Sequence, residues 1–67
     1  MQTFLESILG EKLAIEQYSN IVRSAQKATE AIGWEILLRL DVKDKVVSDK
    51  IYELLAPKFA ELKELVS

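Results

Sequence analysis

The most regular feature of this chain is an apolar stripe in each half that advances in alternating steps of four and three residues. In the first half the stripe passes through Phe4, Ile8, Glu11, Ile15, Tyr18, Val22 and Ala25. In the second half it passes through Gly33, Leu37, Leu40, Asp44, Val47, Ile51 and Leu54. These steps follow the a and d positions of a heptad, which face a neighbouring helix. The pattern therefore predicts two long amphipathic helices.

Capping and turn signals set the expected bounds of the first helix. Thr3 followed by Glu6 matches a capping box, which starts a helix over residues 3–27. A turn at Gly33 is one alternative, because glycine often interrupts a helix. We expect the turn at residues 27–29 instead, since the second stripe continues in register back through Gly33. A glycine inside a helix costs only about 1 kcal/mol.

The second helix is expected over residues 30–55, ended by Pro57, and a short third helix over residues 57–66. The apolar faces of the two long helices are wider than one neighbour covers. The predicted fold is therefore all-α, a single domain over residues 1–67. It consists of an antiparallel two-helix hairpin and a short C-terminal helix, and two copies dimerise into a four-helix bundle. Trp34, near the bend, is expected at an edge or a subunit contact.

Size and composition narrow the classes of function. A core in a chain of 67 residues seldom supplies more than about 3–5 kcal/mol without a disulfide, a metal or a partner. Cysteine and histidine are both absent, which excludes disulfides, zinc fingers and serine-hydrolase triads. Self-association is the expected stabiliser, as a homodimer or a higher homo-oligomer.

Charge and hydropathy argue against two classes of partner. The net charge of −2 does not suit nucleic acid, which favours a basic surface. No apolar run approaches the ~20 residues that span a bilayer, so no membrane partner is expected. The expected location is the cytoplasm.

Glu11 and Asp44 place a carboxylate at an inward position of each stripe. A buried carboxylate without a partner costs several kcal/mol, so the pair needs an explanation. With a turn at residues 27–29, the two side chains would lie side by side on the two helices. A symmetric dimer would then gather two copies of each at its centre.

Residues 11–18 (EKLAIEQY) resemble the first helix of ferritin-like proteins of the bacterioferritin and rubrerythrin type. In that family a metal-binding glutamate precedes a tyrosine by seven residues. Residues 35–55 look like the helix that carries the family's Glu-x-x-His, and the resemblance covers roughly residues 4–55. It implies a ferritin-like half-domain with Glu11 and Asp44 at metal-ligand positions. Val47 stands where the family has its histidine, so ordinary di-iron oxidase chemistry is not expected.

Three interpretations of the acidic pair follow. Glu11 and Asp44 could be structural, satisfied by a tyrosine hydroxyl, a lysine or water, and fix the helix register. They could hold Mg²⁺, Mn²⁺, Ca²⁺ or, loosely, iron between two chains. They could also be misplaced, if the turn lies elsewhere.

The favoured function is a non-catalytic, self-assembling helical hairpin that has lost a di-iron site, with no cofactor. The alternative is a small iron- or manganese-handling protein whose dimer interface forms an all-carboxylate site. The segment after Pro57 is expected either to dock on its own bundle or to bind a protein partner as a helix in a groove. Its apolar residues are Phe59, Leu62, Leu65 and Val66.

Overall fold

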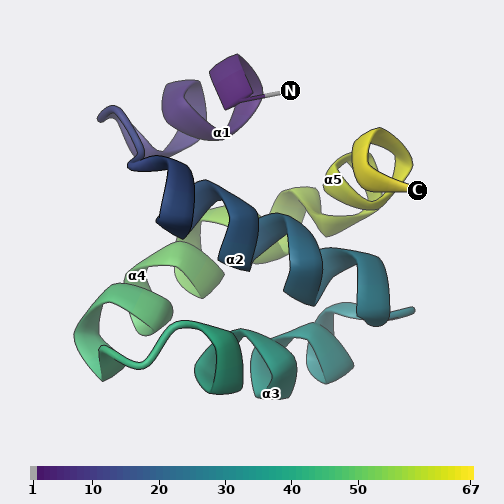
Figure 1. Cartoon of the computed structure of the whole chain (residues 1–67). Helices are drawn as coiled ribbons and strands as arrows, with labels where there is room; N and C mark the ends of the chain where they lie inside the picture. Colours follow the sequence, from purple (N-terminus) through teal and green to yellow (C-terminus); the bar gives the residue numbers. More distant parts are fainter. Residues whose placement is uncertain (1) are drawn as a thin grey trace.

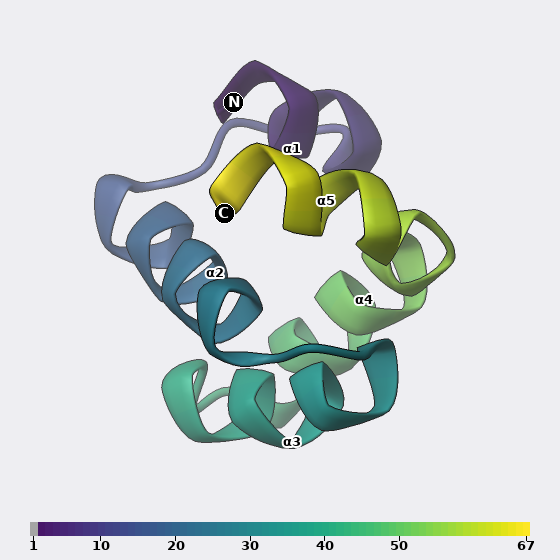
Figure 2. The same ribbon diagram turned by 90° about the vertical axis from the view of Figure 1, so that its right-hand side faces the viewer.

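The computed structural model describes residues 2–67, and this part of the chain is all-helical, as predicted. Its elements are α1 (Gln2–Leu9), α2 (Ile15–Lys27), α3 (Ala31–Asp41), α4 (Lys45–Leu55), the 3-10 helix η1 (Ala56–Lys58) and α5 (Phe59–Val66). α1 and α3 lie at opposite ends of the molecule, with α2, α4 and α5 between them (Figures 1 and 2). Short helices thus replace the two long ones that the sequence predicts.

The predicted helix over residues 3–27 is broken at residues 10–14. Gly10 adopts a φ of 78°, a left-handed conformation that glycine enters without the cost paid by other residues. Its amide donates to Glu6 O at 2.8 Å and so closes the last turn of α1. The Glu6 carboxylate accepts the amide of Leu13 at 3.1 Å. Glu6 therefore stabilises the connection between α1 and α2. The predicted capping box is wrong, because Thr3 lies inside α1 and not at its start.

The predicted helix over residues 30–55 is broken at residues 42–44. Val42 is extended, with φ −108° and ψ 103°, and its side chain is buried. Asp44 then caps α4 by accepting the amides of Val46 and Val47 at 3.0 and 3.3 Å. Aspartate is among the preferred residues at this position because it satisfies amides that lack a partner within the helix. The chain therefore ends one helix and starts another where the stripe predicts continuity.

The turn between the two halves agrees with the sequence. α2 ends at Lys27 and α3 begins at Ala31, so the turn lies at residues 28–30 and Gly33 lies inside α3. The end of α4 at Leu55, just before Pro57, is also as predicted. The third helix is present as α5, preceded by η1.

A hydrophobic cluster that includes Trp34 joins the helices. The Trp34 ring is fully buried, with its centroid 5.2 Å from that of Phe59 and 5.6 Å from that of Tyr52. Its Nε1 donates to Ser24 Oγ at 2.9 Å, and that hydroxyl donates to Ile21 O at 2.8 Å. Each buried donor thus has an acceptor, which avoids the cost of an unsatisfied polar group. The expectation that Trp34 packs at an edge is wrong.

α5 is fastened to α2 by reciprocal caps. Lys63 Nζ donates to Ala25 O at 3.0 Å and to Gln26 O at 2.8 Å, at the C-terminus of α2. Gln26 Nε2 in turn donates to Val66 O at 3.0 Å, at the C-terminus of α5. A cation is favourable at the negative end of a helix dipole, where carbonyls lack partners within the helix. These contacts fix the C-terminal segment on its own chain.

Most of the C-terminal apolar residues pack in the core of the chain itself. Phe59, Leu62 and Val66 are buried, and Leu65 is exposed. Of the two alternatives for this segment, docking on the rest of the chain is confirmed. The predicted partner surface at these four residues is wrong, because three of the side chains are covered by the protein itself.

Candidate interaction surface

Glu11 lies in the α1–α2 connection and points away from the core. Its side chain is 65% exposed, and its Oε1 lies 3.6 Å from Lys50 Nζ on α4. An exposed ion pair of this kind contributes about 0–1 kcal/mol to stability. The predicted inward orientation of Glu11 is wrong because the break at Gly10 removes it from the helical stripe.

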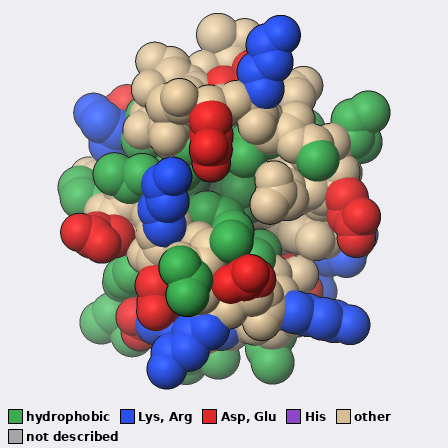
Figure 3. All heavy atoms as spheres, turned by 90° about the vertical axis from the view of Figure 1, so that its left-hand side faces the viewer, with side chains coloured by type: hydrophobic (Ala, Val, Ile, Leu, Met, Phe, Trp, Pro, Cys, Tyr) green, Lys and Arg blue, Asp and Glu red, His purple; other side chains and the backbone are tan. Residues whose placement is uncertain are grey.

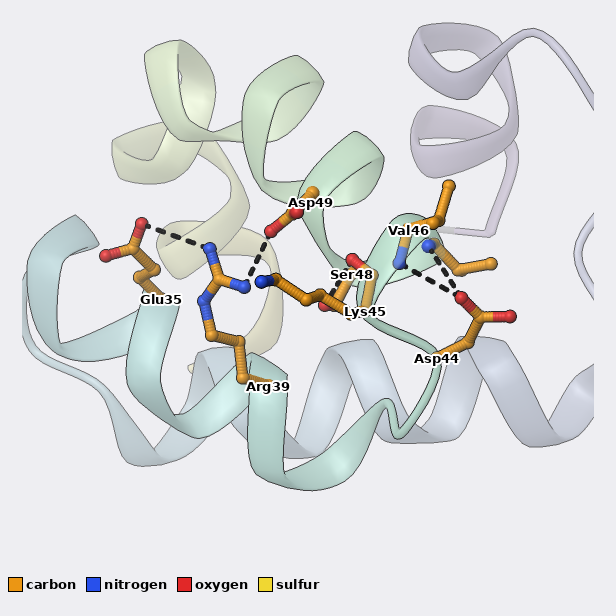
Figure 4. Close-up of polar contacts among 8 residues, drawn as sticks. Glu35, Arg39, Asp44, Lys45, Val46, Ser48 and Asp49 are labelled. Atoms are coloured by element: carbon orange, nitrogen blue, oxygen red, sulfur yellow. Dashed lines mark hydrogen bonds and ion pairs between the residues drawn. The ribbon is translucent and has the colours of Figure 1, made fainter.

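Asp44 is exposed and has a local role at the start of α4 (Figure 4). Its Oδ1 accepts the amides of Val46 and Val47, which explains an aspartate here without a partner helix. The predicted inward orientation of Asp44 is wrong, because the residue precedes α4 instead of lying in mid-helix. The stripe that both carboxylates interrupt does not exist as a continuous helical face.

The two carboxylates do not form a metal centre with other side chains of the described chain. Within residues 2–67 no three or more histidine, cysteine, aspartate or glutamate side chains are grouped so that they could hold a metal ion. Glu11 lines one surface hollow with Lys50, and Asp44 lines another with Asp41 and Lys43. Metal binding by Glu11 and Asp44 stays a prediction of the sequence alone.

The hollow beside Asp44 measures about 550 Å³ and separates α2 from the α3–α4 connection. Its lining mixes acidic and basic side chains, namely Glu16, Arg23, Asp41, Lys43 and Asp44. Within residues 2–67, Asp41 Oδ2 is buried without a hydrogen-bond partner. A second hollow, of about 140 Å³, lies between the start of α2 and α4 and has an apolar floor that includes Leu9, Leu13, Val47 and Ile51. Figure 3 shows hydrophobic side chains at the floor of a depression on the side where these elements lie, with charged side chains at its margin.

Ile32, Ile36 and Leu40 form an exposed apolar row along α3, which we call the α3 outer face. They are 72%, 61% and 70% exposed, respectively. Their spacing of four residues places them on successive turns of one side of the helix. The opposite side carries Trp34 and Leu38, which are fully buried. α3 is thus apolar on the side facing the core and on the side facing solvent.

The two flanks of the α3 outer face differ in character. On one flank lie Glu35 and Arg39, with Arg39 Nη2 3.8 Å from Glu35 Oε2. Arg39 Nη1 also lies 2.6 Å from Asp49 Oδ1 on α4 (Figure 4). On the other flank lie Leu37, which is half-buried, and Gly33, which is exposed. A Cβ built on Gly33 would meet no atom of the described residues within 4 Å, apart from its chain neighbours and the backbone of its own helix.

The remaining exposed apolar side chains are scattered over other helices. They are Ile15 on α2, Val46 and Leu54 on α4, and Leu65 on α5. Single exposed apolar residues are normal on proteins, whereas the largest contiguous apolar patch is often functional. Among the described residues, the α3 outer face is such a row of exposed apolar side chains on one side of a helix. The sequence contained its signal, since isoleucine or leucine recurs every four residues from 32 to 40.

Comparisons with known proteins found no matching family model, no matching curated protein and no matching solved structure. The ferritin-like resemblance of residues 4–55 therefore stays a prediction of the sequence, and the short helices show no sign of that architecture. Within residues 2–67, no helix has both the length and the apolar character needed to cross a bilayer.

Proposed function

We propose that this protein is a non-catalytic helical module that self-associates through the α3 outer face. The observation that carries the proposal is the exposed row of Ile32, Ile36 and Leu40 on a helix whose other side is already buried. α3 is apolar on two opposite sides, whereas a typical surface helix is apolar only on the side that faces the core. A partner that covers the α3 outer face would bury the second apolar side of this helix.

The polar groups of the chain support a non-catalytic role. Histidine and cysteine are absent from the sequence, which removes the commonest general base and the thiol nucleophile. The buried hydroxyls of Ser24 and Ser48 donate to the carbonyls of Ile21 and Lys45 within their own helices. These two serines therefore serve the packing of the core. The metal-handling alternative lacks a comparable observation, because Glu11 and Asp44 line two different hollows of the chain.

The size of the row predicts a weak, reversible complex. Fully burying one isoleucine or leucine side chain contributes about 1.5–3 kcal/mol, and the three residues of the α3 outer face are roughly two-thirds exposed. Six such side chains from two copies would contribute about 6–12 kcal/mol. Association itself costs about 4–15 kcal/mol in lost freedom. The net gain is therefore at most about 8 kcal/mol, so the dissociation constant is expected to be no tighter than about micromolar.

Sedimentation equilibrium tests the proposal directly. We expect the average mass of the wild-type protein to rise between about 10 µM and 1 mM, the range set by the expected affinity. Ile36→Asp puts a charge at the centre of the row and should keep the protein monomeric. The matched control is Val46→Asp, which alters a 77% exposed apolar residue on α4 and should associate like the wild type.

Circular dichroism of both variants verifies that the helices are retained. A wild-type protein that stays monomeric at the highest concentration would refute self-association. Equal loss of association in Ile36→Asp and Val46→Asp would place the contact outside the α3 outer face.

A further inference from the structure

We infer that two copies pair their α3 outer faces in an antiparallel arrangement, with Ile36 of each copy at a two-fold axis. The inference rests on the proposed self-association and specifies its partner and geometry. It follows from the unequal flanks of the row, because the direction of pairing decides which flank meets which.

In a two-fold antiparallel pair of helices, each flank meets the same flank of the other copy. The charged flank with Glu35 and Arg39 would then face itself, and so would the flank with Gly33 and Leu37. A parallel pair would instead bring the charged flank of one copy against the apolar flank of the other. Burying those charges beside apolar side chains would cost free energy without giving them a partner.

Charge complementarity holds on the charged flank. Glu35 lies one residue before Ile36, and Arg39 lies three residues after it. At 1.5 Å per residue, an antiparallel pair places Glu35 within about 3 Å in height of the second copy's Arg39. The internal contact between these side chains is loose, at 3.8 Å, so Glu35 can turn toward the other copy. Opposite charges would meet twice across the two-fold axis.

Shape complementarity holds on the apolar flank. Gly33 lies three residues before Ile36, and Leu37 lies one residue after it. The antiparallel pair therefore places Leu37 within about 3 Å in height of the second copy's Gly33. Beyond its chain neighbours and its own helix backbone, no atom of residues 2–67 lies within 4 Å of a Cβ built on Gly33, so the helix surface here is open to a leucine of the second copy. Gly33 lies in the first turn of α3, and a glycine within a helix weakens it. Close approach of a second helix gives this glycine a reason to be there.

Disulfide trapping tests the geometry, and the absence of native cysteine makes single-cysteine variants unambiguous. We would prepare Ile36→Cys, Ile32→Cys and Leu40→Cys and oxidise each alone. Ile32→Cys and Leu40→Cys would also be oxidised as a mixture. Val46→Cys on α4 serves as the control for random collision.

Antiparallel pairing predicts that Ile36→Cys links to itself about tenfold faster than Val46→Cys, because a disulfide needs Cα atoms within about 7 Å. Two copies of residue 32 would lie about 12 Å apart in height, whereas residue 32 lies level with the second copy's residue 40. Ile32→Cys and Leu40→Cys should therefore link slowly alone and about tenfold faster as a mixture.

The outcomes separate this inference from the proposed function. Fast self-linking of Ile32→Cys without mixed linking, in a protein that sediments as a dimer, would indicate a parallel pair and overturn the inference alone. Linking at the Val46→Cys rate for every variant of a dimeric protein would overturn the inference and place the contact elsewhere. A monomer in sedimentation would overturn both.

Discussion

Replacing Ser24 by alanine would leave the indole N–H of Trp34 without its acceptor in the centre of the core. Within residues 2–67 this N–H donates to Ser24 Oγ at 2.9 Å, and both side chains are fully buried. Leaving a buried donor unsatisfied costs about 1–3 kcal/mol. A core of this size seldom supplies more than roughly 3–5 kcal/mol, so the variant should lose a large part of its stability.

Urea unfolding followed by circular dichroism and by the fluorescence of the single tryptophan measures the loss. Thermal unfolding gives a second measure. In a domain of 60–100 residues, each 1 kcal/mol of lost stability should lower the midpoint of thermal unfolding by about 4–8 °C. The matched control is Ser48→Ala. Ser48 is equally buried, but its hydroxyl donates to Lys45 O of its own helix turn at 3.1 Å. Its removal leaves no donor unpaired and should cost less than about 1 kcal/mol.

A double-mutant cycle with Trp34→Phe isolates the contact. Phenylalanine has no N–H that needs an acceptor. The loss of stability caused by Ser24→Ala should therefore be smaller by at least about 1 kcal/mol in the Trp34→Phe background than in the wild type. Additive losses in the cycle, or a Ser24→Ala variant as stable as Ser48→Ala, would refute the central role of this hydrogen bond.

Three further substitutions test individual contacts by chemical unfolding. Lys63→Met removes the cation that binds Ala25 O and Gln26 O and should cost about 1–2 kcal/mol; no loss would mean that the packing of α5, not the cap, holds it to α2. Asp44→Ala removes the N-cap of α4 and should cost about 1 kcal/mol, and a gain in stability would contradict a capping role. Gly33→Ala should stabilise dilute monomer by about 0.5–1 kcal/mol while weakening association measured by sedimentation; unchanged association would argue against close approach at Gly33.

The turn of the chain could be predicted from the apolar pattern of the second half. This pattern continued in register back through Gly33 and so placed the turn before that glycine. α3 begins at Ala31, in agreement with this prediction. Pro57 likewise marked the end of α4, since proline is not tolerated inside a helix.

The two breaks were missed because the stripe crosses them in phase. Short helices joined by connections of a few residues can keep a four-and-three spacing that belongs to no single helix. The local signals were present, since Gly10 is a common helix end and Asp44 a preferred helix start. Interpreting Gly10 as a helix end and Asp44 as a helix start would also have explained why Glu11 and Asp44 interrupt apolar positions. An acid in a stripe is therefore evidence for a helix end as well as for a buried site.

The side of α3 that faces the core could not be predicted from its own pattern. Leu37 and Leu40 were expected to face inward, yet Leu40 is exposed and Trp34 is fully buried. An apolar residue lies on nearly every face of this helix, so amphipathicity gives no orientation. The contacts of Trp34 with Tyr52 and Phe59, far along the chain, decide it.

The mode of pairing also decides where assembly stops. An isologous contact uses the same surface on both copies, so an antiparallel pair covers both α3 outer faces and leaves none for a third copy. The other exposed apolar side chains, such as Ile15 and Val46, lie on different helices and do not form a second row on one helix. A head-to-tail contact between unlike surfaces would instead continue into a filament. Self-association through α3 should therefore saturate at twice the monomer mass, however far the concentration is raised.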